Sequence, residues 1–122
     1  MSPALHVDVD EPAGGSFKPG EWVRGRVRVV EGGDSRALSV AVRFRERTSD
    51  YSATPATYGE SVLHQGELTA GASFPFAIQL PSDCVPCFET LNAELYYEVH
   101  AQSDERGPDT HAELRIDVRA RR

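Results

Sequence analysis

Six arginines of this sequence occur in two runs in which every second residue is an arginine. Guanidinium groups bind carboxylates and phosphates through paired hydrogen bonds, so each run is a candidate site for an anion or a partner. Successive side chains of an extended strand point to opposite faces, so the arginines of one run share a face. The candidate residues are Arg24, Arg26, Arg28, Arg43, Arg45 and Arg47.

The two runs pose an electrostatic problem if their strands pair in one sheet, because like charges directly opposite each other destabilise a sheet. Acidic strands between the arginines would solve it, and the segments Glu94 to Glu98 and Glu113 to Asp117 are candidates. Otherwise the surface binds an anionic partner. The simplest interpretation is a solvated sheet face with balanced charges.

Other reactive side chains form weaker candidates. Cys84 and Cys87 have C-x-x-C spacing, but a redox motif also needs a setting that lowers the thiol pKa, such as a helix amino terminus. A zinc site needs two more ligands, for which only dispersed histidines are available: His64, His100 and His111. Ser61 and His64 are three residues apart and so face opposite sides of a strand. We therefore predict no catalytic site, metal or cofactor, and one cysteine packed as a small hydrophobic residue.

The elements that position these side chains are strands, because period-two alternation dominates the sequence and Gly, Pro and Asp clusters separate the alternating segments. A polar loop is expected at 48–60. Strands with one apolar face are typical of two packed antiparallel sheets. The sequence predicts an all-β, immunoglobulin-like antiparallel β-sandwich of about seven strands, with residues 1–122 as one domain. The expected strands are 5–9, 23–29, 38–47, 62–68, 74–80, 95–101 and 112–118.

Three residues give more detailed predictions about this architecture. The backbone nitrogen of Pro75 donates no hydrogen bond, so Pro75 should lie in an edge strand or at the start of a strand. Gly25 in mid-strand indicates a bulge or the close approach of another backbone. Tyr97 should point inward, with its hydroxyl bonded at the border of the core. The expected core is Val23, Val27, Val29, Leu38, Val40, Val42, Phe44, Phe74, Phe76, Ile78, Leu95, Tyr97, Val99, Leu114 and Ile116.

Charge and composition limit the classes of partner. The 122 residues include 13 basic and 19 acidic side chains, and the net charge of −6 disfavours broad binding of nucleic acid or anionic membranes. The sequence shows no secretory signal, and no apolar run approaches the ~18 residues of a membrane helix. Two cysteines do not make a disulfide framework. We expect a cytoplasmic protein without membrane insertion.

Four segments, in order, resemble the arrestin-like N-terminal domain. "FKPGEWVRGRVRV" (17–29) is similar to the opening of that domain, and "ALSVAVRFRER" (37–47) to the long strand that follows. "LTAGASFPFAIQLPSDCVPCF" (68–88) and "ELYYEVHA" (94–101) resemble its later segments. Arrestins, α-arrestins, the retromer cargo-adaptor subunit and bacterial sporulation-control proteins are similar to one another in this fold.

The resemblance implies scaffolding, since these relatives bind proteins and are not known as enzymes. They usually carry two sandwiches in tandem, whereas this sequence has one. Visual and β-arrestins sense phosphate partly through a lysine pair in the first strand, which here reads "LHVDVDEP", and the Pro-Pro-x-Tyr motif of α-arrestins is missing. No phosphate-sensing residue is therefore carried over.

We predict a bacterial-type, non-enzymatic protein-interaction module, an adaptor or scaffold with an unidentified protein partner. The alternative is a β-sandwich that binds an anionic small molecule, a glycan, or a phosphorylated or acidic peptide through an arginine-rich sheet face. A homodimer is a further expectation, because the strand at 112–118 has regular alternation and no proline to guard its edge.

Overall fold

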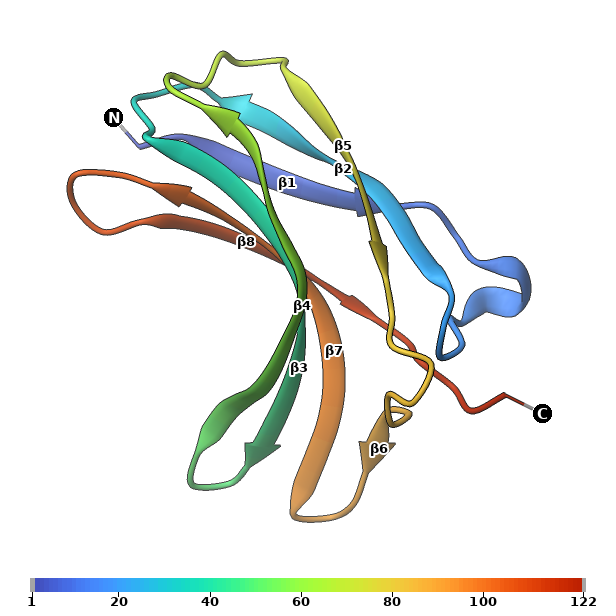
Figure 1. Ribbon diagram of the computed structural model, residues 1–122. Helices are drawn as coiled ribbons and strands as arrows, with labels where there is room; N and C mark the ends of the chain where they lie inside the picture. The colour runs from blue at the N-terminus through green and yellow to red at the C-terminus, as the bar shows by residue number, and fades with distance from the viewer. Residues whose placement is uncertain (1, 122) are drawn as a thin grey trace.

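The computed structural model describes residues 2–121 and contains two antiparallel β-sheets (Figure 1). One sheet has the strand order β1-β2-β5. In the other, β4, β3, β7 and β6 are neighbours in that order, and β8 also pairs with β7. This all-β sandwich is the predicted fold class. The described strands are β1 (Ala4–Val9), β2 (Trp22–Glu31), β3 (Ala37–Thr48), β4 (Ser52–Gln65), β5 (Ser73–Gln79), β6 (Phe88–Glu89), β7 (Ala93–Asp104) and β8 (Thr110–Ile116), with a short 3-10 turn, η1 (Ala13–Gly15), between β1 and β2.

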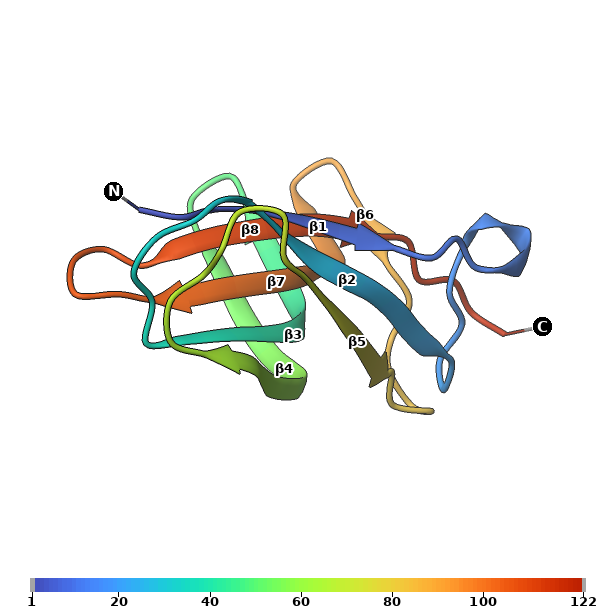
Figure 2. The same ribbon diagram turned by 90° about the horizontal axis from the view of Figure 1, so that it is seen from above.

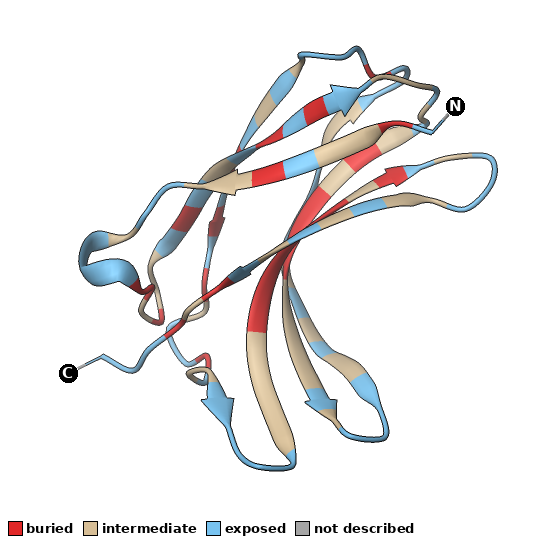
Figure 3. Cartoon of the chain, turned by 180° about the vertical axis from the view of Figure 1, so that it is seen from behind, coloured by how far each residue is buried: buried red, intermediate tan, exposed pale blue. Residues whose placement is uncertain are grey.

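The core lies where the apolar faces of the two sheets meet (Figure 3). Eleven of the residues predicted for it are buried: Val23, Val27, Val29, Leu38, Val40, Val42, Phe76, Ile78, Tyr97, Val99 and Ile116. Phe44, Phe74 and Leu114 are partly buried against this cluster, whereas Leu95 is half-buried outside it. The lower ends of β3, β4 and β7 extend beyond the three-stranded sheet (Figure 1), so that sheet does not cover this end of the apolar face.

The strand β4 corrects two sequence predictions. Residues 48–60 were expected to be a polar loop and 62–68 a strand, but Ser52–Gln65 form one long strand. This strand is an edge of its sheet, and its ladder with β3 shifts register at three places. Each one-residue shift moves the following side chains to the other face of the sheet. The period-two pattern of apolar and polar residues is therefore lost along β4.

The expectations for Pro75, Gly25 and Tyr97 are confirmed. Pro75 lies on β5, at the edge of the three-stranded sheet. A Cβ atom added to Gly25 would lie 2.0 Å from the carbonyl oxygen of Asp8, so the backbone of β1 approaches here as only glycine allows. Tyr97 is buried and donates its hydroxyl hydrogen bond to the carbonyl of Val85.

The last strand is more enclosed than its sequence indicates. β8 pairs with β7 along one side, and β1 of the other sheet lies alongside it (Figures 1 and 2). Beyond the end of β8, Val118 forms a parallel bridge with Phe17, which ties the two sheets together. The edges on the other side of the sandwich are β4 and β5.

No described residue belongs to a helix with the length and hydropathy needed to cross a membrane. The candidate functional side chains lie on strands and on the loops between them. Two sheet faces point away from the core, and each carries one of the two runs of arginines.

Candidate partner-binding site

The two runs of arginines lie in different sheets, so the six guanidinium groups do not share one surface. Arg24, Arg26 and Arg28 belong to β2 in the three-stranded sheet. The other three belong to β3 in the five-stranded sheet. Figure 2, seen from above, shows β2 and β3 as parts of separate layers. Each run must therefore be judged by its own neighbours.

The arginines of β3 are interleaved with acidic residues of β7, which is the first of the two arrangements considered from the sequence. Arg43 lies opposite Glu98, and Arg47 lies opposite Glu94. One carboxylate oxygen of Glu94 accepts hydrogen bonds from Arg47 and from Arg115 of β8, both at 2.8 Å. The Arg115 hydrogen bond leads the effects that lower the pKa of Glu94. We call this cluster the β3 network: Arg43, Arg45, Arg47, Glu94, Glu98 and Arg115.

The centre of the β3 network is largely removed from water. The Nε atoms of Arg43 and Arg45 lie 3.5 and 3.7 Å from the carboxylate of Glu98, and all three side chains are less than one-quarter exposed. The same two arginines donate hydrogen bonds to the hydroxyl of Thr54 on β4. Burial, followed by the charge of Glu113, raises the pKa of Glu98 despite the arginines beside it. These guanidinium groups are engaged within the protein.

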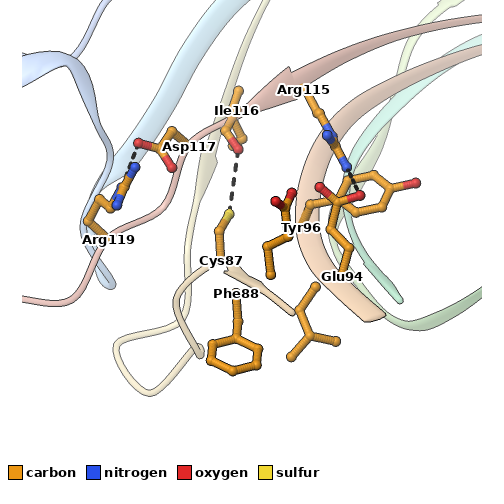
Figure 4. Close-up of a pocket in the computed structure, with 10 residues that line it drawn as sticks. Cys87, Phe88, Glu94, Tyr96, Arg115, Ile116, Asp117 and Arg119 are labelled. Atoms are coloured by element: carbon orange, nitrogen blue, oxygen red, sulfur yellow. Dashed lines mark hydrogen bonds and ion pairs between the residues drawn. The ribbon is translucent and has the colours of Figure 1, made fainter. Parts of the chain in front are cut away.

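A cleft beside the network lies between β6 and the end of β8 (Figure 4). Its wall includes Tyr96, whose ring lies 3.8 Å from the guanidinium carbon of Arg115. Arg119, also in the wall, donates a hydrogen bond of 2.8 Å to Asp117. Both arginines are thus paired with carboxylates inside the cleft, which leaves neither cation free for a bound anion.

The arginines of β2 have a different environment. All three side chains are exposed on the outer face of the sheet. Arg28 donates a hydrogen bond of 2.8 Å to Asp8, and although desolvation opposes it, this contact holds the pKa of Asp8 below its usual value. Among residues 2–121, no carboxylate lies within 4.0 Å of the guanidinium group of Arg24 or Arg26.

Two apolar residues extend this exposed row at its ends. Trp22 is 48% exposed and Val30 is 57% exposed. The guanidinium carbon of Arg24 lies over the Trp22 ring, 5.3 Å from its centre. We call this set the β2 row: Trp22, Arg24, Arg26, Arg28 and Val30. Trp22 and Val30 are not among the site residues predicted from the sequence, although their even numbering is in phase with the arginines and was sufficient to find them.

The two flanks of the β2 row differ in charge. On one side, β5 places Ala77 opposite Arg24, Pro75 opposite Arg26 and Ser73 opposite Arg28. These three side chains are short, uncharged and exposed. On the other side, β1 presents His6 and Asp8 on the same face as the row, and Asp10 follows just beyond the end of β1, where its backbone N–H donates to the carbonyl of Arg24. The row therefore has a flat neutral lane along β5 and an acidic border along β1.

The two cysteines and the three candidate histidines, His64, His100 and His111, lie apart from this row. Cys84 is buried in the core as the small hydrophobic residue that the sequence predicts. The sulfur of Cys87 accepts a hydrogen bond from the backbone N–H of Val118, which anchors the end of the chain after β8. His100 and His111 contact each other, with ring nitrogens 2.9 Å apart. In the described part of the chain, no three His, Cys, Asp or Glu side chains are arranged to hold a metal ion.

Taken together, the eight described strands and their pairing define an arrestin-like β-sandwich, and comparison with known proteins supports this class. The structure is similar to that of Spo0M, a sporulation control protein from Bacillus subtilis, with a TM-score of 0.74 and 21% sequence identity over 99% of this chain. The match covers 51% of the Spo0M chain, so this chain spans about half the length of that protein. No protein-family model matches the sequence, and no curated protein matches it either. The resemblance predicted from the four segments is confirmed for the fold.

Proposed function

We propose that residues 1–122 form a non-enzymatic adaptor or scaffold domain that docks a protein partner on the β2 row. The observation that carries this proposal is the exposure of Arg24 and Arg26 without carboxylate partners among the described residues, next to an exposed Trp22. Arg and Trp are among the side chains that most often dominate the energy of protein–protein interfaces. The likeness to a protein described as a sporulation control protein supports a regulatory role over catalysis.

The alternative function, binding of an anionic small molecule or glycan, would use the same arginines. Small ligands are usually held in concave sites that cover most of their surface. The β2 row lies on the outward face of a three-stranded sheet, with exposed side chains on β5 beside it. This open geometry favours a macromolecular partner over a small ligand.

Affinity capture from the native cell tests the role of the β2 row. We expect wild-type protein to retain at least one protein that the double variant Arg24→Glu/Arg26→Glu does not retain. The matched control is Arg36→Glu/Arg106→Glu, which changes the net charge equally at two exposed arginines away from the row and should retain the partner. Equal capture by all three folded proteins contradicts docking on the β2 row.

The remaining expectations from the sequence stay predictions. They are the cytoplasmic location, the bacterial setting, the single-domain organisation and the homodimer. Sedimentation at micromolar concentration decides the last of these, because a single species near 13.4 kDa is a monomer. A dimer through β8 would also have to accommodate β1, which lies alongside that strand.

A further inference from the structure

We propose that the β2 row binds an extended polypeptide segment of a partner protein in which every second residue is acidic. This inference rests on the proposed function and names the chemistry of the partner. The segment lies over the neutral lane of β5, its carboxylates meet Arg24 and Arg26, and its apolar residues contact the ends of the row. Charge complementarity is the physical basis of the choice.

Arg24 and Arg26 have no carboxylate partner among residues 2–121. An exposed arginine in a sheet commonly pairs with an acidic residue across the ladder, as Arg28 does with Asp8. On β5 the residues opposite Arg24 and Arg26 are the uncharged Ala77 and Pro75. On β1 Asp8 lies opposite Arg26, but its carboxylate bonds to Arg28 and is not within 4.0 Å of the Arg26 guanidinium group. The guanidinium groups of Arg24 and Arg26 are therefore accessible to the carboxylates of a partner segment that lies along β5.

The spacing of Arg24 and Arg26 matches the repeat of an extended polypeptide. Side chains two residues apart on a strand are separated by about 6.8 Å, and they point to the same face. An extended partner segment has the same repeat, so acidic residues at alternate positions reach both arginines in register. A single phosphate group is held best by donors that converge on one point, whereas the donors of Arg24 and Arg26 are distributed along the row. Two separate carboxylates fit this distribution better than one phosphate.

The borders of the β2 row limit the width of its occupant. Asp8 on β1 and Asp10 just after it repel a broad polyanion such as nucleic acid, which would cover both flanks of the row, and the net charge of −6 adds to this repulsion. A narrow segment over β5 stays on the uncharged side. Trp22 and Val30 offer apolar contacts at the two ends, so the complementary sequence is apolar at its ends and acidic at alternate positions between them.

The chain carries its own reporter for this interaction, because Trp22 is the only tryptophan in the sequence. The probe is a nine-residue peptide with leucine at both ends, glutamate at its third, fifth and seventh positions, and serine elsewhere. We expect a saturable change in Trp22 fluorescence, with the same dissociation constant by calorimetry. A peptide of identical composition with its three glutamates adjacent should bind at least about fivefold more weakly, because fewer of its carboxylates reach the row in register.

Variants of the protein test which side chains are responsible. Arg26→Glu should weaken the binding of the alternating peptide at least about tenfold, which corresponds to ~1.4 kcal/mol. Arg106→Glu, with the same change in net charge, should leave it unchanged within about twofold. The double variant Arg24→Glu/Arg26→Glu should instead bind the peptide in which lysine replaces glutamate, and this charge exchange shows that the variant surface is folded.

Four results would overturn the proposal: no saturable binding of the alternating peptide, equal affinity for the peptide with adjacent glutamates, equal loss in Arg26→Glu and Arg106→Glu, or displacement of the peptide by equimolar inorganic phosphate. The capture experiment separates this outcome from failure of the proposed function. One result is that the Arg24→Glu/Arg26→Glu variant fails to retain the cellular partner while the wild-type protein does not bind the alternating peptide. In that case the β2 row is an interface, but its occupant is not an extended acidic segment.

Discussion

The β2 row and the β3 network begin from the same sequence pattern, arginine at every second position of a strand, and end in opposite physical states. The arginines at the centre of the β3 network are largely buried and share the carboxylate of Glu98. In the β2 row, Arg24 and Arg26 are exposed and have no such partner among residues 2–121. The difference comes from the neighbouring strands. β7 supplies two glutamates to the arginines of β3, whereas β5 supplies alanine and proline, and the Asp8 that β1 places opposite Arg26 bonds to Arg28 instead.

This contrast shows which arginines have a structural role and which are available for binding. A buried guanidinium that loses its carboxylate costs stability, because the charge stays in a site of low polarity. An exposed guanidinium costs almost nothing to replace. Substitutions in the two regions should therefore separate stability from binding. The expected effects below run from the largest to the smallest.

Truncation of a core side chain beneath the β2 row should have the largest effect on stability. Phe76 is 7% exposed and lies opposite Gly25 on the inner face of the three-stranded sheet. Phe76→Ala should lower the free energy of unfolding by ~3–5 kcal/mol, measured by chemical denaturation. The control is Phe88→Ala, at a phenylalanine that is 59% exposed, which should cost less than about 1 kcal/mol. Equal effects of the two substitutions would contradict the position of the core.

Acidification should destabilise the sheet that carries the β3 network. Burial, then the charges of Arg43 and His111, lower the pKa of His100 from 6.5 to about 4, while Glu113 acts in the opposite direction. The unfolded chain therefore binds this proton first, and the stability contributed by neutral His100 decreases as the pH falls from 6.5 towards 4, by an amount on the order of 3 kcal/mol.

Denaturation of wild-type and His100→Gln protein across this pH range measures the contribution of His100. The variant should show a shallower loss of stability than the wild type. The raised pKa of Glu98 works in the opposite sense, because the folded state favours its protonated form as the pH falls through and below that raised value. Identical pH profiles for the two proteins would show that His100 is not the group responsible.

Removal of the shared carboxylate should have an intermediate effect on stability. Glu98→Gln leaves Arg43 and Arg45 without their counter-charge and should cost about 1–3 kcal/mol. The raised pKa of Glu98 shows that burial and Glu113 outweigh the attraction of the arginines for its charge, so the net cost should lie at the lower end of this range, about 1 kcal/mol. Urea denaturation at neutral pH gives the value. A variant as stable as the wild type would mean that the network is no stronger than a solvated surface.

The smallest effect on stability should come from the β2 row itself. Arg24→Ala and Arg26→Ala should each change the free energy of unfolding by less than about 0.5 kcal/mol, because both side chains are exposed and have no carboxylate partner among the described residues. Arg43→Ala is the matched substitution in the β3 network and should cost more than either. If Arg26→Ala destabilises the fold as much as Arg43→Ala, the row is structural and is not held available for a partner.

Much of the fold follows from local patterns, and the exceptions have identifiable causes. The alternation places the apolar residues of β2, β3, β5 and β7 on inner faces, and it assigns Pro75 to an edge and Gly25 to a close approach. It fails for β4, where three register shifts mix the two faces of an edge strand. It also overestimates the exposure of the last strand, because the position of β1 beside β8 depends on how the two sheets pack.

For the candidate site, the sequence by itself determined which side chains share a face. Arg24, Arg26 and Arg28 project together because side chains alternate along a strand, and the same rule applies to Trp22 and Val30. Only the tertiary structure decided what lies beside them. The residues beside each arginine come from distant parts of the chain: Glu98 lies opposite Arg43, and Pro75 and Asp8 lie opposite Arg26 on its two sides. Strand order across a sheet is set by packing of the whole core, which no local alternation encodes.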